Sequence, residues 1–161
     1  MKYNYSSSNS SNNRKTNGYT LIELMVVLSV LSILTITSLE GLFRTKANMD
    51  LNRAAYQLEA ILKDCQSKAM YTGSNYKIDF QIPVNRYRIY KDYELVNTVQ
   101  LDSVILFNTN FDYHKVRFTK NGTPSMGGTV TLKTKYGKTL YVIMTPVTAR
   151  TRISTKPPAN W

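Results

Sequence analysis

Two pairs of basic residues near the carboxyl terminus have a spacing that could place positive charge in rows. Lys133 and Lys135 are two residues apart, as are Arg150 and Arg152, and Lys138 lies between the pairs. Side chains two residues apart point to the same side of an extended strand. Rows of lysine and arginine bind phosphate groups without regard to base sequence, and this binding weakens strongly as salt rises. These five residues are therefore candidate DNA contacts.

The charge of the whole chain is concentrated in the same region. The net charge is +11 over 161 residues. Residues 1–18 contribute +3, residues 19–112 contribute −1, and residues 113–161 contribute +9 with no Asp or Glu. Tyr136 and Tyr141 lie near the basic pairs and could stack on bases. Three other interpretations stay open for this region: a solvated basic surface, contact with acidic partner subunits, and contact with an anionic cell-wall polymer.

Other residues that commonly carry catalysis are almost absent. The chain has one histidine, His114, and one cysteine, Cys65. It lacks the sequence motifs of serine hydrolases, P-loop nucleotide-binding proteins and zinc metalloproteases. A lone cysteine cannot form an internal disulfide, and Cys65 falls among apolar residues, where a small core side chain is expected. We therefore expect no enzymatic activity, no cofactor and no metal site.

One carboxylate, Glu23, stands at the start of a long apolar stretch. Residues 24–39 carry no charge, and extending the stretch back to Tyr19 gives 21 residues. As a helix this length would measure about 31 Å, close to the hydrocarbon thickness of a bilayer. A carboxylate inside a membrane span is costly and needs a partner. Basic residues flank the stretch on both sides, and the lack of acids before it favours a cytoplasmic amino terminus.

The residues around Gly18 resemble a known processing motif. A polar, basic leader ends at Gly18, and YTLIELMVVLSVLSIL follows at once. This pattern resembles the class III leader of type IV pilins and pseudopilins. The resemblance implies cleavage after Gly18 by a membrane prepilin peptidase, methylation of the new amino terminus at Tyr19, and pairing of Glu23 with the amino-terminal amine of an adjacent subunit. The alternative for Glu23 is a neutral acid at the depth of the headgroups.

The rest of the chain predicts one long helix followed by short strands. Apolar residues recur at three- and four-residue steps from 51 to 69, and Gly73 would end a helix that begins near Thr20 and reaches Tyr71. From residue 76 the pattern alternates with a period of two. The expected strands are 76–82, 86–90, 93–101, 104–107, 115–119, 129–135, 139–144 and 148–154.

These elements predict an α+β fold of the pilin-like kind. A long amino-terminal helix, membrane-spanning in its first half, would pack on a small, mostly antiparallel β-sheet domain with one or two sheets. The predicted organisation is a cleaved leader at 1–18, a transmembrane and assembly helix at 19–44, a soluble domain at 45–154 and a frayed tail at 155–161.

A second resemblance concerns residues 116–130, VRFTKNGTPSMGGTV. This segment resembles the strand-loop-strand of GspH/FimT-type minor pseudopilins, and among them it looks most like the competence pseudopilins of the ComGD type from Gram-positive bacteria. Its glycines are expected to permit positive φ in the loop. FimT-type pilins bind DNA through a G-R-x-R element, and Ala149-Arg150-Thr151-Arg152 falls at the matching place with Ala in place of Gly.

The resemblances imply an assembly role. The leading hypothesis is a minor pseudopilin of a competence filament for DNA uptake, processed by prepilin peptidase and assembled with other pilins, with an assembly ATPase and membrane platform acting indirectly. DNA would be contacted without sequence specificity. The leader would stay in the cytoplasm, and the carboxyl-terminal domain would lie outside the membrane and enter a surface filament. The alternatives are a minor subunit of a type II secretion pseudopilus or type IV pilus without DNA binding, and a membrane-anchored nucleic-acid receptor that works outside any filament.

Overall fold

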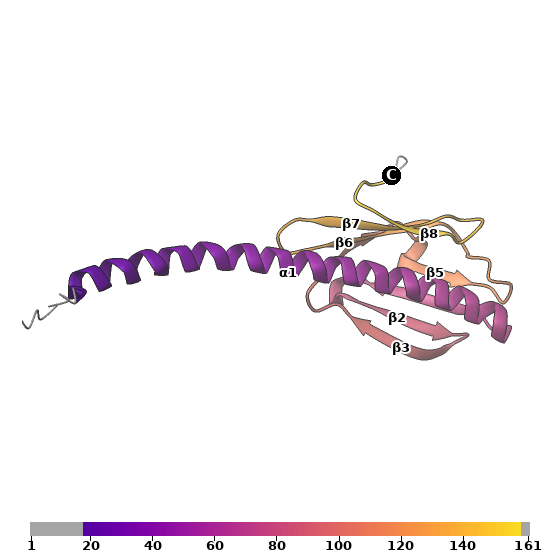
Figure 1. The fold of residues 1–161 in the computed structure, drawn as a ribbon. Coiled ribbons are helices and arrows are strands. Elements are labelled where there is room, and N and C mark those ends of the chain that lie inside the picture. The colour runs from indigo at the N-terminus through magenta and orange to yellow at the C-terminus, as the bar shows by residue number, and fades with distance from the viewer. Residues whose placement is uncertain (1–17, 159–161) are drawn as a thin grey trace, which may run out of the picture. The chain divides into compact units, whose positions relative to one another are not determined.

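The computed structural model describes residues 18–158 as one long helix followed by short strands (Figure 1). Two short 3-10 helices interrupt the strands. The predicted leader lies almost entirely outside the described residues. The elements are α1 (Leu21–Thr72), β1 (Tyr76–Gln81), η1 (Ile82–Val84), β2 (Arg86–Lys91), β3 (Glu94–Gln100), β4 (Ile105–Thr109), η2 (Asp112–His114), β5 (Lys115–Phe118), β6 (Gly128–Lys133), β7 (Thr139–Met144) and β8 (Thr151–Ser154).

The prediction of a long helix is confirmed to within one residue at each end. Thr20 precedes α1, and its Oγ1 accepts a hydrogen bond of 3.2 Å from the backbone N–H of Glu23. This bond satisfies one of the N–H groups that have no partner within the helix. At the other end, Gly73 has a φ of +64°, the left-handed conformation that commonly ends helices.

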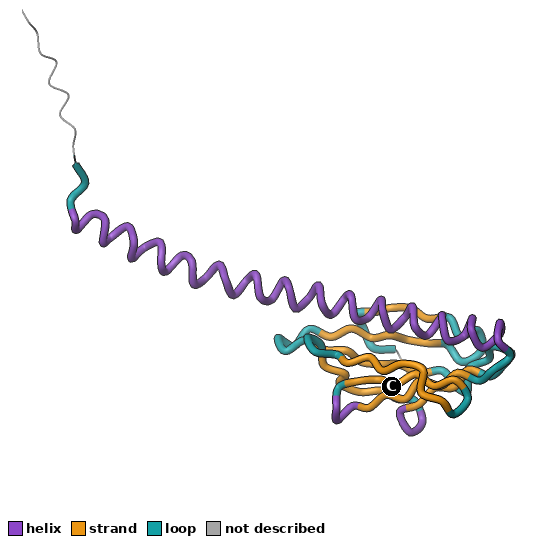
Figure 2. Tube along the Cα trace, turned by 90° about the horizontal axis from the view of Figure 1, so that it is seen from below, coloured by secondary structure: helices purple, strands orange, loops and turns teal. Residues whose placement is uncertain are grey.

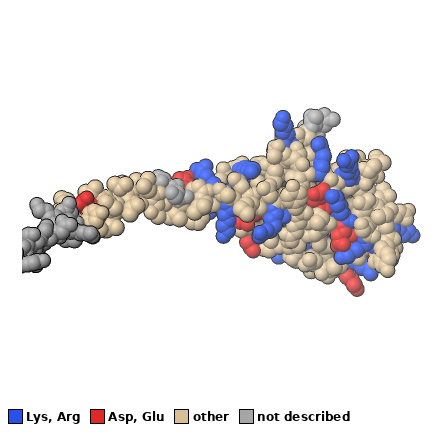
Figure 3. Space-filling view, in the orientation of Figure 1, with Lys and Arg blue, Asp and Glu red and all other residues tan. Residues whose placement is uncertain are grey.

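The chain divides into two compact units, with the boundary between Leu39 and Glu40. In the first unit, the described side chains of α1 are exposed and almost all uncharged (Figure 3). The hydroxyl groups of Ser29 and Thr35 donate to the backbone carbonyls of Met25 and Leu31, each at 2.7 Å. Polar groups satisfied in this way are compatible with a hydrocarbon environment. This part of α1 is long and apolar enough to cross a membrane.

The second unit has a single core to which the helix and both sheets contribute. The second half of α1 runs along the strands (Figure 2). Its predicted apolar stripe is confirmed: all members are buried except Ile61, which is half-buried. The buried members are Leu51, Ala54, Ala55, Leu58, Leu62, Cys65 and Ala69. The expectation that Cys65 is a core side chain is confirmed.

The strands form two four-stranded antiparallel sheets, with orders β3-β2-β1-β5 and β4-β6-β7-β8. We call them the first and second sheet. Each predicted strand has a counterpart, so the expected α+β fold is confirmed. The departures that affect the basic residues are at β6 and β8: β6 stops at Lys133, two residues before its predicted end, and β8 starts at Thr151, three residues after its predicted start.

The glycines of the segment 116–130, Gly122, Gly127 and Gly128, have different roles, and the prediction of positive φ is right for only one of them. Gly122 has a φ of +75°, whereas Gly127 and Gly128 do not adopt positive φ. They are required by close packing instead. A Cβ on Gly127 would lie 2.9 Å from the carbonyl oxygen of Met144, and one on Gly128 would lie 2.5 Å from the Phe111 ring.

Candidate processing site and nucleic-acid interface

The predicted cleavage site lies in an open segment just before α1. Residues 18–20 have no regular secondary structure and are exposed, and the Tyr19 side chain is 87% exposed. No atom lies within 4 Å of the place that a Cβ on Gly18 would occupy. The peptide bond between Gly18 and Tyr19 is therefore accessible along the described part of the chain, as a cleavage site requires.

Glu23 lies in the first turn of α1 among exposed apolar side chains. An acidic residue is favourable there because the helix dipole is positive at its amino end. Thr20 and Glu23 also have the residue types and three-residue spacing of a capping box, in which the acid at the third helical position supports the cap. Within residues 18–158 no basic side chain forms an ion pair with Glu23. Its predicted pairing with a neighbouring subunit stays a prediction.

The five basic candidates do not form the two strand rows that the spacing predicts. Lys133 is the last residue of β6, so Lys135 lies in the following turn rather than on the strand. Arg150 likewise precedes β8. The prediction that each pair shares a strand face is therefore wrong, because the strands are shorter than the alternation of residue types suggests.

A different pair, Lys133 and Arg152, shares a face of the second sheet. Lys133 is opposite Thr139 on β7, and Arg152 is opposite Ile143 on the same strand. Partners in an antiparallel pair point to the same side, and Thr139 and Ile143 are four residues apart, so they point to the same side too. Four residues of strand measure about 13 Å. The core-facing side of β7 carries Leu140 and Val142 instead, so Lys133 and Arg152 are on the outer side.

Two aromatic side chains accompany these charges, one between them on β7 and one beside Lys133 on β4. Tyr141 is opposite Thr131 on β6 and points outward with Lys133 and Arg152. Phe107 on β4 is 56% exposed, and the Lys133 Nζ lies 5.0 Å from the centre of its ring. Sequence reasoning missed Phe107. Phe107 points away from the core because its neighbour Leu106 is buried, and the irregular register between Leu106 and Asn108 lies at this position.

We call Phe107, Lys133, Tyr141 and Arg152 the outer face of the second sheet. A shallow cavity of about 280 Å³ lies on this face, lined by Phe107, Asn108, Thr131, Tyr141 and Pro157. The combination of flat rings with flanking cations is typical of surfaces that bind single-stranded nucleic acid, where bases stack and phosphates meet lysine or arginine.

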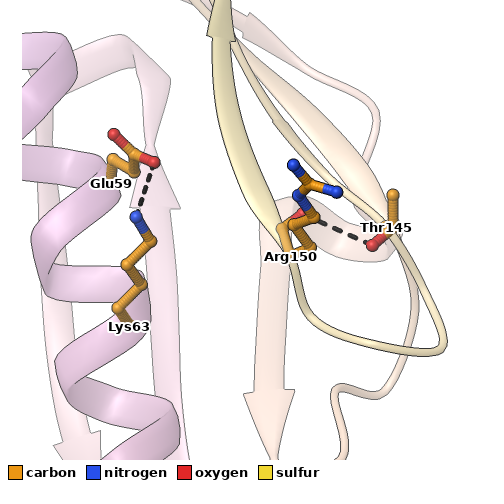
Figure 4. A network of polar contacts seen from close by, with 4 residues as sticks. All are labelled: Glu59, Lys63, Thr145 and Arg150. Carbon is orange, nitrogen blue, oxygen red and sulfur yellow. Dashed lines mark hydrogen bonds and ion pairs between the residues drawn. The ribbon is translucent and has the colours of Figure 1, made fainter.

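Arg150 lies in the connection between β7 and β8 (Figure 4). The Thr145 backbone N–H donates to the Arg150 carbonyl at 3.0 Å, which closes this connection. Ala149 has a φ of +51° and is buried. Alanine thus adopts the left-handed conformation that glycine favours. In the described part of the chain, neither Arg150 nor Arg152 has an ion-pair partner, whereas Glu59 and Lys63 on α1 form an ion pair of 2.7 Å.

Lys135 and Lys138 belong to a separate group at the β6–β7 hairpin. The Nζ of Lys135 lies 5.1 Å from the centre of the Tyr136 ring. The guanidinium carbon of Arg44, on α1, lies 5.5 Å from the same ring. The structure therefore places the hairpin lysines beside the helix, and Lys133 and Arg152 on the outer face of the second sheet.

Comparisons with known proteins agree with these features. Residues 13–39 match the model of the prokaryotic N-terminal methylation motif, which covers Gly18, Tyr19 and Glu23. No curated protein matches. Among solved structures, the chain is similar to the minor pseudopilin EpsH from the type 2 secretion system of Vibrio cholerae, with a TM-score of 0.56 and 11% identity over 65% of this chain and 96% of that chain. The chain therefore has a pilin-like fold with a prepilin-type amino terminus.

Proposed function

We propose that this pilin-like chain is a minor pseudopilin of a competence filament that takes up DNA. Prepilin peptidase would cleave it after Gly18, and the first half of α1 would anchor it in the membrane and then pack against other pilin helices in the filament. Glu23 would be neutralised by the amino-terminal amine of the neighbouring subunit. The domain that begins near Glu40 would face the outside of the cell and contact DNA.

The outer face of the second sheet carries this proposal. Lys133 on β6 and Arg152 on β8 are offset by about 13 Å along the strands and by two strand spacings, about 10 Å, across the sheet, with β7 between them. Tyr141 on β7 lies between them, and the exposed Phe107 ring on β4 lies beside Lys133. No acidic residue occurs after Asp112, so nothing on β6, β7 or β8 opposes the positive charge. Such a surface favours sequence-independent binding.

Arg150 comes immediately before β8 and adds a second arginine next to Arg152. Ala149 has the left-handed backbone conformation that a glycine at this position would favour. The Ala in place of Gly is therefore compatible with the G-R-x-R element that the resemblance implies. Arg150 and Arg152 are thus proposed as DNA contacts together with Lys133. Lys135 and Lys138, which lie at the hairpin, are not needed for this surface.

A second candidate is a minor subunit of a type II secretion pseudopilus. The observation that favours it is the fold similarity to EpsH, which is described as a minor pseudopilin of such a system. In that case the basic face would contact acidic partner subunits rather than DNA. The two candidates differ in whether the mature chain binds DNA by itself.

The test is DNA binding by the full mature chain in detergent, measured against salt. Arg150→Gln with Arg152→Gln should weaken binding and lower the salt slope by about 1 for each phosphate that is no longer neutralised. The matched control is Arg53→Gln with Arg117→Gln, which removes the same charge from exposed positions on α1 and β5. Equal weakening of DNA binding in both double variants, or no DNA binding at low salt, would contradict direct DNA contact by Arg150 and Arg152 and would favour the secretion candidate.

A further inference from the structure

The β6–β7 hairpin and the adjacent turn of α1 form a basic cluster that the DNA-binding proposal does not use. We call Arg44, Lys46, Lys135, Tyr136 and Lys138 the hairpin patch. All of these side chains are exposed, and Tyr136 is 38% exposed with Arg44 and Lys135 beside its ring. Lys46 and Lys135 also line one cleft of about 360 Å³.

The hairpin holds its lysines in fixed positions. The Thr134 N–H donates to the Lys138 carbonyl at 2.8 Å, and the Gly137 N–H donates to the Thr134 carbonyl at 3.0 Å. The Lys138 N–H donates to the buried Thr134 hydroxyl at 3.1 Å. The turn is therefore closed by three hydrogen bonds, and little conformational freedom would be given up when Lys135 and Lys138 meet a partner.

Helix geometry places Arg44, the first residue of the hairpin patch, within one polar-layer thickness of the uncharged stretch along α1. Arg44 follows Leu39, the end of the uncharged stretch, by five residues of the same helix, which is a rise of about 8 Å. The polar layer on each side of a bilayer has a similar thickness. Leu42 and Phe43 are exposed apolar residues on the same turn. Tyrosine and long basic side chains next to a span are typical of this interface.

The acidic residues around the hairpin patch do not cancel its charge. Glu40 pairs with Arg44 at 2.8 Å, and Asp50 and Asp102 line the same cleft as Lys46 and Lys135. The hairpin turn itself, residues 134–138, carries two lysines and no acid. The basic residues of the hairpin patch therefore outnumber these acids, and Lys135 lies beside Arg44 in the first turns of α1 that belong to the second unit.

We propose that the hairpin patch binds anionic phospholipid headgroups of the leaflet from which α1 emerges, and so holds the unassembled subunit against the membrane. This inference rests on the membrane anchoring in the proposed function, and it is independent of DNA uptake. Lysines near an anionic surface gain affinity for it within a Debye length, and salt removes the attraction. Incorporation into a filament would then break the lipid contact.

The test is lysine acylation of the full chain in nanodiscs, with each site quantified by mass spectrometry. One set of nanodiscs contains phosphatidylcholine alone, and the other contains 30% phosphatidylglycerol. Lys135 and Lys138 should react about fivefold more slowly in the anionic discs, and the difference should disappear at high salt. Lys120 is the reference lysine because it lies near the other end of α1. Gly122, two residues from Lys120, packs on Met70, and Met70 is 26 residues further along α1 than Arg44.

A double variant tests whether the two hairpin lysines are responsible for the lipid contact of the whole hairpin patch. Lys135→Gln with Lys138→Gln should return the Lys46 acylation rate toward its value in phosphatidylcholine, whereas Lys115→Gln with Lys120→Gln should not. Equal rates in both lipids, protection of the hairpin by added DNA instead of lipid, or unchanged Lys46 protection in the first variant would overturn the inference. Failure of the chain to enter nanodiscs would overturn the membrane anchoring as well.

Discussion

The side-chain amide of Asn85 joins the two sheets: its Oδ1 accepts a hydrogen bond of 2.6 Å from the backbone N–H of Leu106. Asn85 precedes β2 in the first sheet, and Leu106 lies on β4 in the second. The Nδ2 of Asn85 donates to the carbonyls of Leu101 and Val104 in the segment between the sheets. Asn85 also has a φ of +52°, which asparagine tolerates better than most residues. The Asn85 side chain therefore fixes the start of β2 in the first sheet to the start of β4 in the second sheet and to the segment that joins the sheets.

Substitution of Asn85 should destabilise the domain through two separable causes. Asn85→Ala removes the hydrogen bonds and places alanine in the left-handed conformation, with an expected decrease of about 2–4 kcal/mol in the free energy of unfolding. Asn85→Gly removes the same bonds without the conformational cost, so its decrease should be about 1 kcal/mol smaller. Urea unfolding in detergent measures both. Equal stability of Asn85→Ala and the wild type would contradict the joining role.

The close packing around Gly128 predicts that a single methyl group is harmful there. A Cβ would meet the Phe111 ring, which is buried and stacked on Phe80 with ring centres 5.8 Å apart. Gly128→Ala should therefore lower the free energy of unfolding by about 1–3 kcal/mol. Gly41→Ala is the control, because no atom lies within 4 Å of its Cβ and alanine favours the helix. A decrease in the control as large as in Gly128→Ala would argue against the packing explanation.

Burial of Cys65 predicts an unreactive thiol and an alkaline loss of stability. Burial, with a smaller effect from Asp64, raises the pKa of Cys65 from 9.0 to about 12. The folded chain thus keeps the thiol proton at a pH where the unfolded chain releases it, so the free energy of unfolding should fall as pH rises from 9.0 to about 12. Burial also raises the pKa of Tyr87, which adds in the same direction.

The measurements for Cys65 are thiol labelling at pH 8 and unfolding as a function of pH. Labelling of the native chain should be at least about a hundredfold slower than labelling in urea. Cys65→Ala should make the alkaline decline shallower and leave the part that Tyr87 contributes. Rapid labelling of the native chain would show that the thiol is accessible and would contradict the burial.

Glu23 should be needed for assembly but not for processing. Glu23→Gln keeps the side-chain shape and the polar group near Thr20 but removes the charge. The chain should be cleaved normally and its amount in sheared filaments should fall by about tenfold or more, since removing one partner of a buried ion pair costs about 3–5 kcal/mol. Glu40→Gln, which removes an exposed acid from the same helix, should assemble normally. Normal assembly of Glu23→Gln would refute the pairing.

The long helix and the order of the strands along the chain could be predicted because they depend on residue periodicity. The stripe from Leu51 to Ala69 repeats at helical spacing, and Gly73 provides the left-handed residue that ends α1. The eight strands follow alternation of apolar and polar residues. In each case the signal is local, and local hydrogen bonding or burial produces the element.

The arrangement of the basic residues could not be predicted in the same way. Lys135 leaves the strand because the Thr134 N–H bonds to Lys138 and closes a turn, and Arg150 leaves it because Ala149 takes a positive φ that alanine rarely adopts. Lys133 and Arg152 are brought together only by the register of β6 and β8 on β7. The pairing between strands is a property of the folded sheet, so it cannot be predicted from the spacing of residues within one strand.

The most direct test of the account is the amino terminus of the chain recovered from sheared surface filaments, determined by mass spectrometry in cells that carry prepilin peptidase. The account predicts a chain that starts at N-methylated Tyr19 and copurifies with other pilin-like subunits, and it predicts that Gly18→Ala leaves the leader attached and the filament fraction empty of this chain. An intact leader on filament-bound chain, a start at another residue, or normal incorporation of Gly18→Ala would contradict it.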